Sequence, residues 1–202
     1  KAQAKGEELS ENDRRDYARD LQNKDWIDRA LRLMGLVRDG VITEEQYEAM
    51  RASTPNANYT SPAVVNAIWN AAKHLGFDGG RVLEPGMGIG HFFGLRPTGM
   101  KIKMSGVELD SVSARIAKQL YQSANIIEGG FESKVAPSAQ NFFDLVIGNV
   151  PFSGDIHPYD PIYNKDRKLS LHNFFIEKSL ALTRPGGVVA VVTSRYTIVA
   201  EN

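Results

Sequence analysis

Five short apolar runs alternate with amphipathic stretches from residue 81 onward, and this alternation restricts the fold more than any other feature. The intervening stretches repeat apolar residues at helical spacing. Strands that alternate with helices usually pair in parallel, because each crossover helix returns the chain to the same edge of the sheet. The sequence therefore predicts an α/β fold with a Rossmann-like, doubly wound and mostly parallel sheet. The expected strands are Arg81–Glu84, Ile102–Glu108, Asn125–Ile127, Phe143–Ile147 and Gly187–Thr193.

Helices are expected before and between these strands. Ser61 suits a helix N-cap, Pro62 takes the favoured first helical position, and Gly76 ends the segment. Two later segments have helical spacing and supply crossovers. The run Arg184-Pro185-Gly186-Gly187 predicts a turn before the fifth strand. The apolar stripes of these helices are Val64, Ile68, Ala72 and Leu75; Val112, Ile116 and Leu120; and Leu171, Phe174, Phe175 and Leu182.

Residues 1–54 predict a charged helical extension that is separate from a core at 55–202. Eleven charges of mixed sign fall within the first twenty residues, which is typical of a solvated surface. From Trp26 to Met50 apolar residues recur at helical spacing, and Thr43 to Gln46 forms a capping box. The pattern indicates a helical hairpin, to which we assign no chemistry.

The charge balance and the lack of cysteine exclude several functions. Lys plus Arg and Asp plus Glu both number 24, so no overall positive field exists to hold nucleic acid or an anionic membrane. A chain without cysteine forms no disulfide or thiolate metal site, which suits a reducing cytoplasm.

No apolar run approaches the ~18 residues of a transmembrane helix, so we expect a cytoplasmic protein without a membrane partner. No metal site is expected either, because metal-ligand spacing is missing among His74, His91, His157 and His172.

A glycine-rich loop follows the first expected strand and predicts a cofactor site. It reads Glu84-Pro85-Gly86-Met87-Gly88-Ile89-Gly90, and its glycines permit a close ligand approach that a Cβ would block. The leading carboxylate favours a cationic group over a pyrophosphate. Glu108 ends the next strand, where a carboxylate can accept hydrogen bonds from both hydroxyls of a ribose. These carboxylates together predict a nucleoside with a cationic tail. The candidate cofactor ligands are Glu84, Pro85, Gly86, Met87, Gly88, Gly90 and Glu108.

A polar and aromatic turn, Asn149-Val150-Pro151-Phe152, follows the fourth expected strand and indicates the edge of an active site. The glycine loop and the ribose acid resemble the first two motifs of the class I S-adenosylmethionine-dependent methyltransferases. The turn resembles the Asp/Asn-Pro-Pro-Tyr/Phe motif of amino-methyltransferases, especially the adenine-N6 DNA methyltransferases. The resemblance implies a class I methyltransferase core, S-adenosyl-L-methionine as cofactor, and methyl transfer to the N6 amino group of adenine in DNA.

The chemistry of an aromatic amine explains the residues of this turn. The lone pair of the amine is delocalised into the ring, so acceptors must draw its hydrogens while the methyl carbon approaches. The resemblance implies that the Asn149 side-chain oxygen and the Val150 carbonyl are these acceptors. Pro151 biases Val150 toward an extended backbone, and Phe152 offers a flat face to a flipped base. Val150 departs from the family's proline, and its additional N–H needs a partner.

Two further matches concern the cofactor. Thr60 lies in a Tyr-Thr-Ser-Pro run that resembles the family's motif before the first strand, which implies contact with the methionine end of the cofactor. Phe131 is implied to stack on the cofactor adenine. Gly130 stands where relatives often carry an acid that binds the adenine amine, so that contact is missing unless Glu132 compensates.

Other matches concern the substrate. Phe175 is implied to lie beside the substrate pocket, although packing in the helix core explains it as well. The segment 153–168 predicts a loop that borders the substrate, and we hypothesise that its cations Lys165, Arg167 and Lys168 meet DNA phosphates. Ordinary solvated charge explains these three residues equally well.

The motif order is that of methyltransferases whose target-recognition region lies toward the C-terminus. We therefore expect a C-terminally truncated core that lacks a target-recognition domain, binds DNA weakly alone, and works with the remaining domains of a longer polypeptide. The motifs also resemble the methylase portions of large phage or mobile-element proteins with helicase domains. Two alternatives stay open: a protein glutamine-amide N-methyltransferase, and a non-catalytic module for cofactor binding or assembly.

Overall fold

The computed structural model describes residues 43, 60–135, 137–152, 156–195 and 197. Apart from Thr43, the predicted extension at 1–54 lies outside this range, as does its boundary with the core. No helix within these segments has the length and apolar character needed to cross a bilayer.

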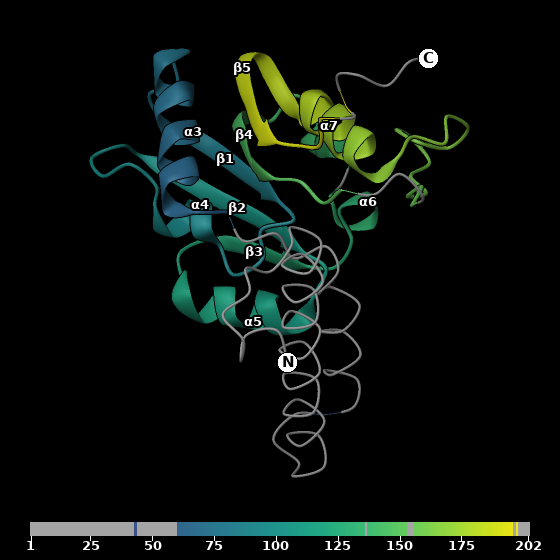
Figure 1. Cartoon of the computed structure of the whole chain (residues 1–202), viewed down its shortest axis with the longest axis horizontal. Coiled ribbons are helices and arrows are strands. Elements are labelled where there is room, and N and C mark those ends of the chain that lie inside the picture. The colour runs from purple at the N-terminus through teal and green to yellow at the C-terminus, as the bar shows by residue number, and fades with distance from the viewer. Residues whose placement is uncertain (1–42, 44–59, 136, 153–155, 196, 198–202) are drawn as a thin grey trace, which may run out of the picture. The chain divides into compact units, whose positions relative to one another are not determined.

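A parallel sheet of five strands forms the centre of the core (Figure 1). Its order is β3-β2-β1-β4-β5. The chain runs from β1 outward through β2 to β3, and then returns to the other side of β1 and runs outward from β4 to β5. This arrangement is Rossmann-like and doubly wound, which confirms the predicted fold class and all five expected strands. The strands are β1 (Gly80–Pro85), β2 (Ile102–Glu108), β3 (Asn125–Glu128), β4 (Phe143–Asn149) and β5 (Thr183–Val192).

Helices cover both faces of the sheet. They are α3 (Pro62–His74), α4 (His91–Gly94), α5 (Ser111–Leu120), α6 (Phe131–Lys134) and α7 (Leu171–Leu182), with a 3-10 turn η3 at Pro137–Ala139. One apolar cluster joins α3, α4 and α5 to one face of the sheet, and a second joins α6 and α7 to the other. Neighbouring strand residues divide between the clusters, as Val82 and Leu83 do on β1, because successive side chains of a strand point to opposite faces.

The first described helix begins where its sequence predicts. The Ser61 hydroxyl accepts a hydrogen bond from the Val64 N–H at 3.4 Å, and Pro62 opens the helix. The chain leaves α3 through Leu75 and through Gly76, whose φ is 98°. The short helix α6 was not expected, because four residues are too few to show a helical period.

The start of β5 corrects one prediction. The run Arg184-Pro185-Gly186-Gly187, expected as a turn before the strand, lies inside β5 as an irregularity. Pairing passes from Phe143 opposite Thr183 to Leu145 opposite Val188, so β5 carries extra residues at this point. The Asp144 carboxylate binds this segment through the Arg184 Nε at 2.6 Å.

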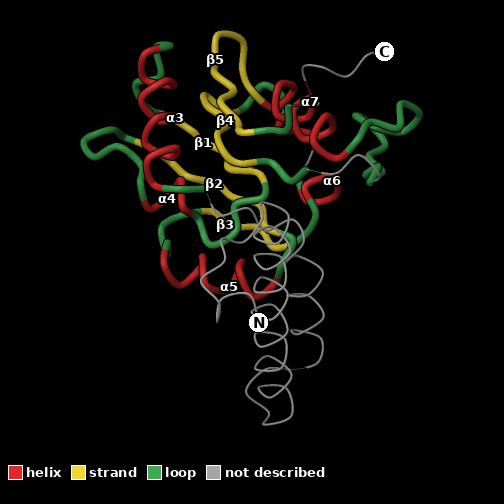
Figure 2. The backbone as a smooth tube through the Cα atoms, in the orientation of Figure 1, coloured by secondary structure: helices red, strands yellow, loops and turns green. Residues whose placement is uncertain are grey.

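A long connection joins β4 to α7 at the end of the sheet where the parallel strands finish; its described residues are coloured as loop and turn in Figure 2. It begins with Val150, Pro151 and Phe152, and its residues 153–155 lie outside the described range. In parallel α/β sheets, ligands bind beyond the carboxyl ends of the strands, where the winding direction reverses. Here that point lies between β1 and β4.

Candidate cofactor and methyl-acceptor site

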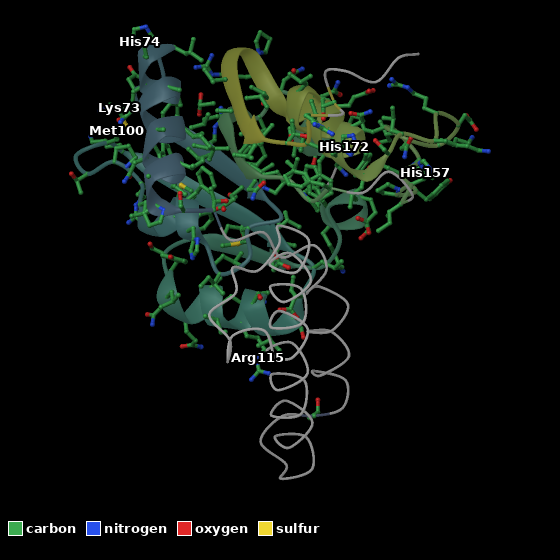
Figure 3. All side chains as sticks on the ribbon, in the orientation of Figure 1. Lys73, His74, Met100, Arg115, His157 and His172 are labelled. Carbon is green, nitrogen blue, oxygen red and sulfur yellow. The ribbon has the colours of Figure 1, made fainter. Side chains whose placement is uncertain are left out.

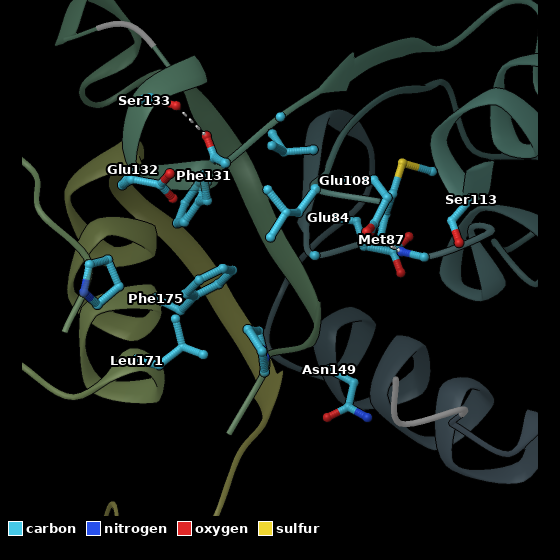
Figure 4. A pocket seen from close by; sticks show the side chains of 18 of the residues that line it. Glu84, Met87, Glu108, Ser113, Phe131, Glu132, Ser133, Asn149, Leu171 and Phe175 are labelled. Carbon is cyan, nitrogen blue, oxygen red and sulfur yellow. Dashed lines mark hydrogen bonds between the residues drawn. The ribbon is translucent and has the colours of Figure 1, made fainter. Parts of the chain in front are cut away.

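A cavity of about 630 Å³ lies beyond the carboxyl ends of β1, β2 and β4. Residues predicted for the cofactor and for the acceptor line it together, although the chain separates them widely. Figure 4 shows Glu84 and Glu108 toward one side of this cavity and Phe131 and Phe175 toward the other. The predicted residues in the lining are Thr60, Glu84, Gly86, Met87, Gly88, Glu108, Phe131, Asn149, Pro151 and Phe175. Those outside it are Pro85, Gly90, Val150, Phe152, Lys165, Arg167 and Lys168.

The glycine loop is held mainly by backbone hydrogen bonds. Gly86, Gly88 and Gly90 have φ values of 65°, 56° and 86°, a left-handed conformation that side-chain-bearing residues rarely adopt. The Met87 N–H donates to the Val107 carbonyl at 3.0 Å, and the Gly90 N–H donates to the Met87 carbonyl at 2.9 Å. The loop therefore turns sharply over the end of β2.

Gly90, a predicted cofactor ligand, lies outside the cavity lining and packs against Tyr121. A Cβ at this position would lie 2.6 Å from the Tyr121 ring. The Tyr121 hydroxyl also donates to the Gly90 carbonyl at 2.8 Å. The loop thus packs against Tyr121, which follows α5. No local sequence motif predicts this contact.

Glu84 presents an acceptor to the cavity. Its side chain is buried, and no hydrogen-bond partner for Oε2 lies among the described residues. Burial raises the pKa of Glu84 well above its ordinary value, against a lowering contribution from the Phe92 backbone N–H. A cationic ligand group would stabilise the ionised carboxylate, so the site fits a ligand with positive charge.

Glu108 fixes the loop as well as facing the ligand space. Its Oε2 accepts from the Gly88 N–H at 2.7 Å, and its Oε1 accepts from the Asp110 N–H at 2.8 Å. Each carboxylate oxygen has a further lone pair, so two ligand hydroxyls can still bind. Burial raises the pKa of Glu108, and the two backbone N–H groups partly offset that rise. The sequence predicted a ribose acid here and missed its tie to the glycine loop.

The opposite wall is aromatic and carries a third carboxylate. The Phe131 and Phe175 rings pack in a tilted arrangement with centroids 4.8 Å apart, and both side chains are buried. A Cβ built on Gly130 would overlap the Glu132 carboxylate. Glu132 also lines the cavity, so its carboxylate fills the space of the side chain that Gly130 lacks.

The turn after β4 lies at the base of the cavity. Asn149 and Pro151 line it, while Val150 is buried. The Val150 N–H donates to the Val192 carbonyl at 3.1 Å, which extends the β4–β5 ladder by one residue. Val150 has an N–H that a proline at this position would lack, and this N–H therefore has a partner. The hydrogen bond fixes the backbone of the turn.

Phe152, the predicted stacking face, does not line the cavity. Phe152 packs against the cluster under α7, outside the cavity lining, because the turn directs it toward the core. Tyr159 lines the cavity instead and is 66% exposed, and Ile156 and Pro158 accompany it. In the sequence, Tyr159 shows only as an aromatic residue soon after the Asn149–Phe152 turn. The path of the connection after β4 is what brings it to the cavity.

The predicted phosphate-binding cations lie on the same connection, outside the cavity lining. Lys165, Arg167 and Lys168 are exposed. Arg167 forms an ion pair with Glu177 of α7. Surface pairs of this kind contribute little to stability, so pairing leaves the guanidinium available to another anion.

No cluster of three or more metal-ligating side chains occurs within the described segments. Figure 3 shows His74 far from His157 and His172. His91 lines the cavity, where its Nδ1 lies 3.3 Å from the Thr60 carbonyl oxygen.

No family model matches the chain. The chain is similar to the protein "Defense against restriction protein B" of Escherichia phage P1, with 28% identity over 180 residues. That match covers 84% of this chain but spans only 8% of the relative.

Among solved structures, a candidate S-adenosyl-L-methionine-dependent methyltransferase of Methanococcus maripaludis has a TM-score of 0.47 and 14% identity, over 72% of this chain and 63% of that one. A candidate caffeoyl-CoA O-methyltransferase of Staphylococcus aureus has a TM-score of 0.46 and 15% identity, over 84% of this chain and 81% of that one.

Proposed function

We propose that this chain is a methyltransferase core that binds S-adenosyl-L-methionine and methylates the N6 amino group of adenine in DNA. One observation carries the proposal: the turn Asn149–Pro151 opens into the same cavity as the carboxylates of Glu84 and Glu108. A nucleoside with a cationic tail can therefore lie beside hydrogen-bond acceptors suited to an amine.

The cofactor residues divide by the part of the ligand that they suit. Glu84 would receive the positively charged methionine end, and Glu108 the ribose hydroxyls. Phe131 and Glu132 both line the cavity, so the Phe131 ring would pack on the adenine and the Glu132 carboxylate would accept from the adenine amine. When bound, the cofactor supplies an electrophilic methyl group on a sulfonium sulfur.

The chain's own contribution is to orient the acceptor amine. The Asn149 side-chain oxygen and the Val150 carbonyl would each accept one amine hydrogen, which localises the nitrogen lone pair for attack. The Val150 N–H bond to Val192 and the restriction imposed by Pro151 hold that carbonyl in place before substrate arrives. Rate would then arise largely from alignment of nitrogen, carbon and sulfur.

DNA is the acceptor that the remaining features favour. Exposed Tyr159 beside the cavity offers a stacking face to a flipped base. Exposed Lys165, Arg167 and Lys168 on the same connection can meet phosphates. The name of the phage P1 relative refers to defence against restriction, and base methylation is one chemistry by which DNA escapes restriction.

Sequence choice would lie outside this chain. The chain corresponds to 8% of the P1 relative, and it is electrically neutral overall. We propose that other domains of a longer polypeptide supply most of the DNA affinity, because few phosphate contacts give weak and salt-sensitive binding.

Transfer of labelled methyl groups tests the proposal directly. The chain is incubated with labelled S-adenosylmethionine and DNA that lacks N6-methyladenine, and the digested nucleosides are analysed by mass spectrometry. We expect labelled N6-methyldeoxyadenosine from the wild type and from Asn125→Ala, an exposed control on β3. Asn149→Ala should lower transfer by about 100-fold or more with little change in cofactor affinity.

Two results would contradict this assignment. Full activity of Asn149→Ala would remove the turn from the chemistry. Label on glutamine amides of added protein, with none on DNA, would make the chain a protein methyltransferase.

A further inference from the structure

Lys178 on α7 is an ammonium group buried inside the protein, close to the cavity but outside its lining. Its side chain is 1% exposed, and that of its partner Asp160 is 3% exposed. Lysine is rarely buried unless it is paired, so this position requires an explanation. Most of the shell around the ammonium is aromatic: the rings of Phe131, Tyr163 and Phe174 have centroids 5.1–5.7 Å from Nζ.

Three acceptors surround the ammonium, one for each of its hydrogens. Nζ donates to the Asp160 carboxylate at 2.8 Å, to the Phe131 carbonyl at 2.8 Å and to the Glu132 carbonyl at 3.2 Å. Hydrogen bonds are strong in such a low-dielectric setting, and a missing partner is expensive. The ammonium therefore links acceptors from two segments of the chain, the one at Phe131 and Glu132 and the one at Asp160.

The second oxygen of Asp160 organises the connection between β4 and α7. Its Oδ1 accepts from the Ile162 N–H at 2.9 Å and from the Tyr163 N–H at 3.0 Å. The Asn164 side chain then donates to the Pro158 carbonyl at 2.7 Å. One carboxylate thus links Lys178 to the whole turn that carries Tyr159.

These contacts join two walls of the cavity. Phe131 and Glu132 line the side proposed for the cofactor adenine, whereas Pro158 and Tyr159 line the side proposed for the acceptor. Both segments meet at Lys178 Nζ, although they are separated in sequence by the whole of β4. Lys178 touches neither ligand position, so any effect on the reaction is exerted through its partners.

We propose that Lys178 is a positioning residue that couples the two sides of the site: a ligand that orders the Phe131–Glu132 segment also orders the turn at Asp160. Ordering one segment lowers the entropy that the other must still lose. Cofactor binding would in this way prepare Tyr159 and its neighbours for the acceptor. The inference rests on a cofactor in the cavity, as proposed above, and not on the identity of the methyl acceptor.

Hydrogen–deuterium exchange with S-adenosylhomocysteine tests the coupling without methyl transfer. In the wild type we expect this ligand to slow exchange in the glycine loop and, by about threefold or more, in peptides covering 156–170. In Lys178→Met the protection of the glycine loop should persist, and that of 156–170 should disappear. Lys118→Met, at an exposed lysine paired with Glu128, serves as the matched control and should behave as the wild type.

A second variant keeps the test decisive if Lys178→Met does not fold. Asp160→Asn keeps an oxygen for the turn but removes the charge that Lys178 binds, and it should reduce protection of 156–170 at saturating ligand. Wild-type protection in both variants, or in the folded one, would overturn the coupling, as would a wild type protected only in the glycine loop. A wild type that shows the coupled protection yet methylates no DNA would instead refute only the proposed acceptor.

Discussion

On the β1–β2 side of the cavity the chain is held mainly by its own backbone, whereas beyond β4 it is held by buried side chains. The glycine loop uses left-handed glycines and backbone N–H groups, including the bond from Gly88 to Glu108. The connection after β4 depends on Asp160, Asn164 and Lys178. The left-handed glycines act within a few residues and appear in the sequence as a motif. Lys178 instead reaches acceptors on two distant segments, and no local pattern marks it.

The largest effect is expected where the side-chain network is cut. Asp160→Ala leaves the Lys178 ammonium buried without its anion, and it should lower the free energy of unfolding by about 3–5 kcal/mol. Urea denaturation measures the change. Asp166→Ala, an exposed aspartate in the same connection, should change it by less than about 0.5 kcal/mol. Equal effects of the two variants would mean that the network does not hold this side of the site.

The next effect concerns ligand binding on the backbone-held side. Glu84→Gln removes the buried anion and should weaken S-adenosylhomocysteine binding by about 1.5–3 kcal/mol, measured by calorimetry. Because burial raises the pKa of Glu84, wild-type affinity should increase as pH rises through that pKa, and the variant should lose this dependence. Glu128→Gln, on the surface, should retain the wild-type profile.

The pH dependence that Glu84 gives to folding stability is expected to be opposite in sign to the one that it gives to ligand affinity. A carboxyl group whose pKa is higher in the folded chain contributes stability that is complete below its unfolded pKa and is lost as pH rises through the folded value. The wild type should therefore lose stability relative to Glu84→Gln as the pH rises from the ordinary pKa of a glutamate to the raised pKa of Glu84 in the folded chain. A constant difference across this range would mean that Glu84 does not titrate as its burial requires.

A pair of glycines separates backbone strain from packing. Gly90 and Gly99 have φ values of 86° and 84°, but of these two only Gly90 lacks room for a Cβ, which would meet the Tyr121 ring and the Met87 methyl group. Gly99→Ala should cost about 1–2 kcal/mol of stability through the left-handed backbone alone. Gly90→Ala should cost about 1 kcal/mol more and should also weaken cofactor binding. Equal losses of stability in Gly90→Ala and Gly99→Ala would show that the Tyr121 ring moves aside without a measurable cost.

The smallest effect is expected from a single hydrogen bond. Tyr121→Phe keeps the ring but removes the donor to the Gly90 carbonyl, so stability should fall by about 1 kcal/mol. Thermal unfolding measures this change, and Tyr159→Phe, at an exposed ring, should leave it unaltered. A larger loss in Tyr121→Phe would mean that side chains hold the glycine loop more than the comparison above allows.

Several features of the site were predictable because they depend on local chemistry. The glycine loop, the carboxylate that ends β2 and the Asn-Val-Pro-Phe turn each combine residue type with position at a strand end. The parallel sheet then brings these strand ends to one edge, so their meeting in one cavity follows from the fold class. The irregular start of β5 did not follow, because a Pro-Gly-Gly run is typical of a turn as well.

Other features needed the path of the chain in space. In the sequence, Val150 is a departure from a motif with an N–H that needs a partner. The pairing of β4 with β5 supplies that partner, the Val192 carbonyl. The Glu132 carboxylate lies in the space beside Gly130 only because of the turn into α6. Tyr159 lines the cavity and Phe152 does not, because the connection after β4 returns to the cavity.

Periodicity and backbone freedom act over a few residues, so the order of the motifs, the glycine loop and the carboxylates at the strand ends could be predicted from the sequence. The role of Lys178 in joining the segments at Phe131 and Asp160 could not, because no motif marks this residue and the contacts depend on the tertiary structure. Its three acceptors lie 18 to 47 residues away along the chain. Bonds over such separations form only after the sheet has brought the segments together, so no local pattern can encode them.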